Sequence, residues 1–91
     1  MKHFVVTLVF TDGLPGPEVG REQQAFVAQL HERGALVMSG PFTDGRGGMA
    51  VLRGDSLEEL RDLYRESPVV RHGGATAEVR EWNVLLDATE Q

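Results

Sequence analysis

The stretch "GALVMSGPF", residues 34–42, decides the fold, because a short apolar run ends here in residues that are typical of turns. Residues 35–40 have the composition of a β-strand. Gly34, directly before them, is a common C-terminal stop for a helix. Gly40 and Pro41 are expected to end the strand, since proline cannot donate a hydrogen bond to a sheet. The stretch therefore predicts the end of a helix, a strand and a turn in succession.

A longer strand is predicted near the start of the chain. "HFVVTLVF", residues 3–10, is rich in β-branched and aromatic residues, which favour strands. Because side chains alternate along a strand, one face is expected to form the core, namely Phe4, Val6, Leu8 and Phe10.

A loop and a helix are predicted between these two strands. Residues 11–20 are rich in glycine and proline, as loops are. An amphipathic helix is predicted from about Gly20 to Arg33, with Pro17 and Glu18 as an alternative first turn. Its apolar side chains recur at helical spacing: Phe26, Val27 and Leu30.

The second half of the chain predicts a hairpin, a helix and a strand. "GMAVLRG", residues 48–54, reads as a third strand, joined to the second by a turn with an Asp-Gly signal. Asp55 or Ser56 is expected to cap a helix that Pro68 limits. "AEVREWNVLL", residues 77–86, is the predicted last strand, with Trp82 in the core.

The order β-α-β-β-α-β predicts an α+β, ferredoxin-like fold in one domain, residues 1–91, with a core of about residues 3–87 and a short polar tail. A four-stranded antiparallel sheet is expected, with two helices on one face. The other face is predicted to be too apolar for an open sheet surface, with Val5, Thr7, Val9, Val79 and Leu85 on it. We therefore predict a homodimer that packs two sheets face to face.

Composition narrows the function classes. Of the 91 residues, 41% are hydrophobic and none is cysteine, which indicates a globular domain without a disulfide or thiol nucleophile. A formal charge of −5 and a single lysine, Lys2, argue against nucleic acid as a partner. The sequence has no long apolar stretch, so no membrane span is predicted, and a cytoplasmic location is expected.

Two polar residues lie at apolar positions of the predicted helices. Gln23 precedes Val27 by four residues, so it shares the core-facing stripe of its helix. Ser67 extends the stripe of Leu60 and Tyr64 in the same way. They are expected either to satisfy free backbone groups at helix ends or to line a ligand pocket.

A helix followed by "HERGALVMSGPF", a hairpin, a "DSLEEL" helix, "SP", a glycine-containing loop and a last strand resembles the YciI-like family of dimeric α+β barrel proteins. The resemblance covers about residues 3–87. It implies that Gly40 and Pro41 shape the rim of a cavity, with Ser39 beside them. It also implies a catalytic pair, a His on the first helix and an Asp before the proline that follows the second. In this chain those positions hold Gln23 and Ser67, which cannot form the pair.

Three hypotheses for function follow. The first is a small dimeric protein that binds an apolar or aromatic molecule in a pocket made by Gln23, Ser39, Gly40, Pro41, Ser67 and His72. The second is a lyase or isomerase acting on a cyclic or polyketide-like substrate, with His72 or His3 as the base. The third is a non-catalytic interaction subunit.

Two further predictions concern the remaining histidine and the binding of a metal. His31 is expected to lie at the end of the first helix, where a protonated imidazole meets the helix dipole favourably. The three histidines show no metal-ligand spacing, so no metal and no cofactor are predicted.

Overall fold

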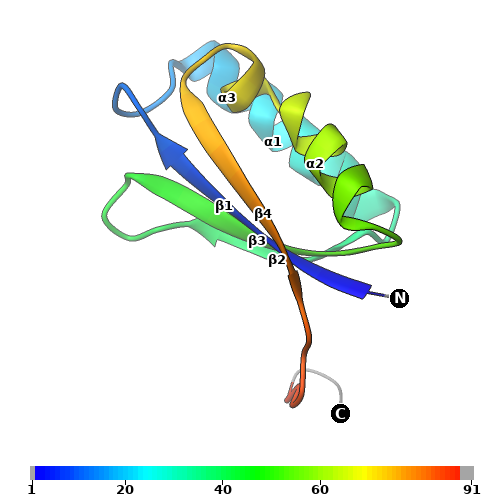
Figure 1. The fold of residues 1–91 in the computed structure, drawn as a ribbon. Coiled ribbons are helices and arrows are strands. Elements are labelled where there is room, and N and C mark those ends of the chain that lie inside the picture. Colours follow the sequence, from blue (N-terminus) through cyan, green and yellow to red (C-terminus); the bar gives the residue numbers. More distant parts are fainter. Residues whose placement is uncertain (1, 89–91) are drawn as a thin grey trace.

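A computed structural model describes residues 2–88; residues 89–91 of the predicted polar tail lie outside the described residues. The elements are β1 (Lys2–Phe10), α1 (Pro17–Glu32), β2 (Leu36–Pro41), β3 (Gly47–Gly54), α2 (Leu57–Arg65), α3 (Pro68–Arg71) and β4 (Ala75–Trp82). The helices lie together on one face of the sheet (Figure 1). The predicted ferredoxin-like α+β fold is confirmed, with α3 as an additional short helix.

The sheet has the strand order β2-β3-β1-β4, and every neighbouring pair is antiparallel. Val6 in the central strand β1 lies between Ala50 of β3 and Val79 of β4. The face that carries these three residues is covered by the helices and holds the core. The most buried side chains of this core cluster, from the sheet and the helices together, are Phe4, Val6, Leu30, Leu52, Leu60 and Tyr64. The predicted core face of the first strand is therefore confirmed.

The prediction was wrong about which face of the last strand is buried. Val79 is 6% exposed and belongs to the core beside Val6, not to the open face. Trp82, predicted in the core, pairs with His3 on the open face and is 48% exposed. Leu85 lies beyond the end of β4, which stops at Trp82. The cause is the pairing register, because a shift of one residue moves each side chain to the other face.

The second strand does not end at Gly40, because β2 runs on through Pro41. Proline is tolerated here since β2 is an edge strand with a partner on one side only. Close approach of the strands also requires glycine in β3. A Cβ on Gly47 would lie 1.9 Å from the carbonyl oxygen of Leu8, and one on Gly48 would lie 2.9 Å from that of Gly40.

Two helix starts depend on proline. α1 begins at Pro17, the alternative first turn that was predicted beside Gly20, and α3 begins at Pro68, which was predicted only as the end of a helix. Both prolines occupy the first turn, where the missing N–H has no helical partner to lose. No helix within residues 2–88 has the length and apolar character needed to span a membrane.

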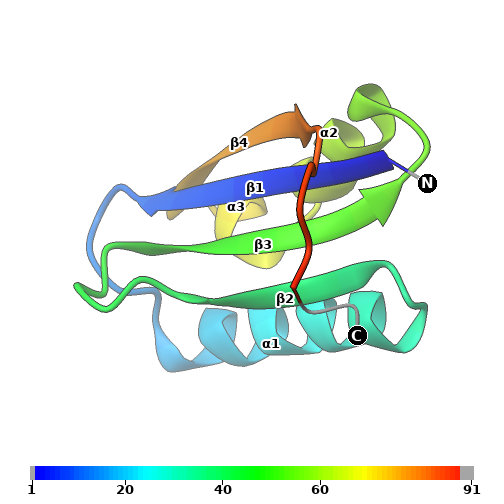
Figure 2. The ribbon, with the colours of Figure 1, turned by 90° about the horizontal axis from the view of Figure 1, so that it is seen from below.

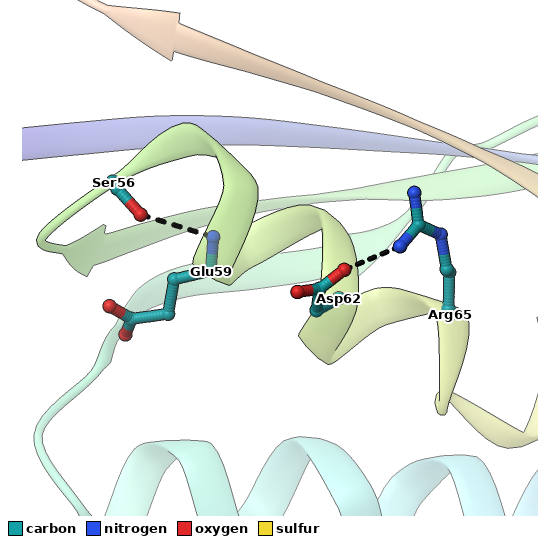
Figure 3. Close-up of polar contacts among 4 residues, drawn as sticks. All are labelled: Ser56, Glu59, Asp62 and Arg65. Atoms are coloured by element: carbon teal, nitrogen blue, oxygen red, sulfur yellow. Dashed lines mark hydrogen bonds and ion pairs between the residues drawn. The ribbon is translucent and has the colours of Figure 1, made fainter.

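The start of α2 is capped by Ser56, one of the two predicted caps. Its Oγ accepts a hydrogen bond of 3.1 Å from the backbone N–H of Glu59 (Figure 3). Asp62 and Arg65 form an ion pair one turn further along the exposed side of this helix. The cap fixes where α2 starts and hence which side chains face the sheet.

Candidate functional site

A cavity of about 570 Å³ lies between α1 and the helix-covered face of the sheet. In the view of Figure 2, α1 runs along the β2 edge of the sheet. One side of the helix forms one wall of the cavity: Gly20, Gln23, Gln24, Val27, Ala28 and His31. Several of these positions are three or four residues apart, so they project from one side of the helix.

The opposite wall comes from the sheet and is mostly apolar. β1 contributes Val6, Leu8 and Phe10, and β2 and β3 contribute Leu36, Ser39, Gly40, Pro41, Gly47, Gly48, Met49 and Ala50. Tyr64 of α2 and Val69 of α3 complete the lining within the described chain, together with Pro15. The lining contains no Asp, Glu, Lys or Arg, and its titratable members are His31 and Tyr64. Such a surface suits an apolar ligand with a few oxygen or nitrogen atoms.

Gln23 has a defined orientation. Its Oε1 accepts a hydrogen bond of 3.2 Å from the backbone N–H of Val69, which joins α1 to α3. Because a backbone N–H needs an acceptor, this contact assigns the oxygen of the amide and leaves the NH2 group for other partners. Gln23 is half-buried and lines the cavity, so it can offer these donors to a bound molecule.

Ser67, the second family position, is placed differently. It is 0% exposed, and its hydroxyl has no hydrogen-bond partner among the described residues. Its backbone carbonyl accepts from the N–H groups of Val70 and Arg71 in α3. The fold therefore brings Gln23 against the α3 turn that Ser67 begins, but Ser67 is outside the cavity lining.

The predicted rim residues lie at the cavity. Ser39, Gly40 and Pro41, the last residues of β2, all contribute to its lining and are exposed to solvent. The β2 edge is thus where the cavity meets the protein surface.

The two histidines considered as bases lie elsewhere. His72 ends α3 outside the cavity lining, with its Nε2 3.7 Å from Oε1 of Glu22. Glu22 also lies 3.8 Å from Nη2 of Arg71, so these half-exposed side chains tie α1 to α3. His3 lies on the open face of the sheet opposite Trp82. The structure does not bring His72 or His3 to the cavity.

His31 is a cavity residue that the sequence analysis missed. It was interpreted as a helix-end residue, and it does lie in the last turn of α1, but its side chain lines the cavity. A signal was present, because Gln24, Val27, Ala28 and His31 follow the i, i+3, i+4, i+7 spacing of one helix face.

Tyr64 lies between the core and the cavity. It is 1% exposed, and its ring meets that of Phe26 edge to face at 5.4 Å. Desolvation by burial raises the pKa of Tyr64 to about 12. Tyr64, which borders the cavity, therefore keeps its phenol neutral even in moderately alkaline solution.

Metal chemistry has no ligand set in the described part of the chain. Across residues 2–88, no three His, Cys, Asp or Glu side chains are grouped so that they could hold a metal ion.

Comparison with known proteins finds a matching family, a relative in sequence and a solved structure with a similar fold. The sequence profile of the YCII-related domain matches residues 16–83. The uncharacterized protein YjpA of Bacillus subtilis (strain 168) is 36% identical over 59 residues, which cover 65% of this chain and 69% of YjpA. A similar solved structure is 5-chloro-2-hydroxyhydroquinone dehydrochlorinase (TftG) from Burkholderia phenoliruptrix AC1100, in complex with 2,5-dihydroxybenzoquinone. It superposes with a TM-score of 0.66 at 15% identity, covering 89% of this chain and 93% of TftG.

Proposed function

Because this chain belongs to the YCII-related domain family, we propose that it binds a ring-containing small molecule in the cavity between α1 and the sheet. The observation that carries the proposal is the apolar, uncharged lining with one oriented amide, that of Gln23. A cytoplasmic location stays a prediction of the sequence analysis.

The size and polarity of the cavity support this ligand class. Its volume of about 570 Å³ lies within the range of small-molecule sites in proteins. Apolar walls favour a ring or hydrocarbon body, because burial of apolar surface stabilises the complex. The Gln23 NH2 group favours an oxygen acceptor on that ring. TftG, with the same fold, holds the oxygenated ring 2,5-dihydroxybenzoquinone, which makes this compound a suitable first probe.

Binding is favoured over the family's His-Asp chemistry. Gln23 cannot exchange a proton near neutral pH, and the Ser67 hydroxyl is buried outside the cavity lining. The alternative bases, His72 and His3, lie away from the lining. The proposal is therefore a binding protein without the family pair.

The open face of the sheet supports the second part of the proposal, a homodimer. Large apolar side chains are exposed on this face, since Val9, Met38 and Trp82 are each about half exposed. Residues 83–88 leave β4 and project away from the sheet on the side opposite the helices (Figure 1). They carry Leu85 and Leu86, which are almost fully exposed. A second copy packed on this face would bury both sets of apolar side chains.

Ligand binding is tested with 2,5-dihydroxybenzoquinone and isothermal titration calorimetry. The unmodified protein is expected to bind, and Ala28→Phe is expected to abolish binding because the new ring fills the cavity. A matched control is Ala25→Phe, on the same helix but outside the lining. Binding that survives Ala28→Phe, or its absence from the unmodified protein, would contradict the proposed site for this probe.

Dimerisation is tested by sedimentation equilibrium at micromolar concentration. The unmodified chain is expected to sediment as a dimer, and Trp82→Glu as a monomer, because a buried carboxylate without a partner is costly. A monomeric unmodified protein would refute the dimer while leaving the ligand proposal standing.

A further inference from the structure

His31 stands out in the cavity by its chemistry. Of the titratable side chains in the lining, Tyr64 is a buried phenol, whereas His31 is exposed to solvent. Imidazole is the side chain that ordinarily gains or loses a proton near neutral pH. His31 is therefore the member of the lining that can exchange a proton with a bound molecule.

The surroundings of His31 contain few other charges. The strands that face it across the cavity, β1, β2 and β3, contribute no titratable side chain to the lining. Glu32 and Arg33 follow it in the chain, and both lie outside the lining. An acidic ligand group that reaches His31 would thus meet no carboxylate of the cavity wall as a competing base.

Gln23 and His31 lie far apart along the same side of α1. They are eight positions apart, which corresponds to about 12 Å along the helix axis. A ligand that contacts both must be longer than a single ring. The cavity volume of about 570 Å³ leaves room for such a molecule.

We infer that the ligand is an elongated, ring-based molecule with an acidic hydroxyl that His31 recognises and an oxygen acceptor that the Gln23 NH2 group contacts. This inference rests on the proposed ligand cavity and names the ligand class. The free nitrogen of the imidazole takes up the proton that the hydroxyl gives up, directly or through water. The resulting enolate or phenolate then pairs with the imidazolium, and no other reactant is needed.

The test compares two probes that differ only at the hydroxyl, 2-hydroxy-1,4-naphthoquinone and its 2-methoxy ether. Both have two fused rings and carbonyl acceptors, but only the first has an acidic proton. The unmodified protein is expected to bind the hydroxyl compound at least about tenfold more tightly, because a charge-assisted hydrogen bond is lost with the ether.

Two variants show whether that preference depends on His31. In His31→Gln the preference is expected to fall to within about threefold, since a neutral amide forms no ion pair with the enolate. Glu32→Gln, which changes the charge of the adjacent residue outside the lining, is expected to keep it. The imidazole resonances of His31 in NMR spectra are expected to shift with the hydroxyl probe more than with the ether.

The outcomes separate the two proposals. If both probes bind and His31→Gln keeps the full preference, the inference about His31 is wrong and the proposed cavity stands. If the unmodified protein binds neither the naphthoquinones nor 2,5-dihydroxybenzoquinone, the proposed function fails and the inference fails with it. Equal binding of both probes by the unmodified protein also overturns the role of His31.

Discussion

The two main helices cover the same face of the sheet in different ways. α2 is short, is capped by the Ser56 side chain and buries both Leu60 and Tyr64 in the core. α1 is much longer, has no side-chain cap at its start and buries only Leu30 fully. The shorter helix is therefore the more tightly packed one.

The difference shows how the fold keeps a cavity open. α1 is held near its C-terminal end by Leu30 in the core and nearer its start by contacts with α3. Those contacts are the Gln23 hydrogen bond to Val69, the Glu22 ion pair with Arg71 and the approach of His72 to Glu22. Between these two attachments Phe26 packs against Tyr64 of the core, while Gln24, Val27 and Ala28 line the cavity. Stability comes from α2 and from the core-facing side chains Phe26 and Leu30 of α1, and binding from the residues of α1 that line the cavity.

The largest expected effect is the loss of stability when packed core side chains of the two helices are shortened. Leu60→Ala and Leu30→Ala should each lower the free energy of unfolding by about 2 to 5 kcal/mol, because each side chain is 2% exposed in the core. Val27→Ala should cost less than about 1.5 kcal/mol, since this half-buried side chain already borders open space. Urea unfolding curves measure all three variants. Equal losses for Val27 and Leu60 would mean that α1 packs as tightly as α2.

A loss of stability at alkaline pH is expected from Tyr64, which borders both the core and the cavity. Its pKa is raised by burial from 10.0 to about 12, so the unfolded chain loses the proton first as the pH rises. Below pH 10 the ionisation of Tyr64 leaves the free energy of unfolding unchanged. Between pH 10 and 12 it lowers the free energy of unfolding by about 3 kcal/mol in total. Tyr64→Phe should remove this part of the alkaline loss.

Because Tyr64 is the only tyrosine, its ionisation can be followed directly by ultraviolet absorbance. Ionisation near pH 10 in the folded protein would show that the phenol is hydrated and that the cavity reaches deeper than described.

The smallest expected effect concerns the start of α2. Ser56→Ala should lower the free energy of unfolding by about 1 kcal/mol, because the N–H of Glu59 loses its acceptor. Asp55→Ala is the matched control and should change stability by less than about 0.5 kcal/mol, since Ser56 supplies the cap. Thermal unfolding of both variants checks this, and a larger loss for Asp55→Ala would assign the cap to the wrong residue.

Local patterns in the sequence predicted much of the fold. The alternation in β1 correctly placed Phe4 and Val6 in the core, and the Asp-Gly turn correctly predicted the β2-β3 hairpin. These features depend on a few neighbouring residues, so the sequence carries them directly. The rim residues Ser39 to Pro41 were also placed at a cavity before the structure, through the family resemblance.

The remaining features depend on contacts between distant segments. Alternation in β4 shows that Val79 and Trp82 face opposite ways, but only pairing with β1 decides that Val79 faces the helices. Pro68 can end one helix or begin another, and the start of α3 depends on its packing against α1 and β4. His31 was missed because a helix-end position explained it well without a cavity.

The central claim is that the ligand binds between α1 and the sheet, and amide NMR spectra test it most directly. Titration with 2,5-dihydroxybenzoquinone should shift the backbone signals of cavity residues such as Gln23, Gly48 and Val69. Signals of the open face, such as those of Val5 and Arg80, should stay in place. Shifts confined to the open face, or no shifts at all at saturating probe, would contradict the account.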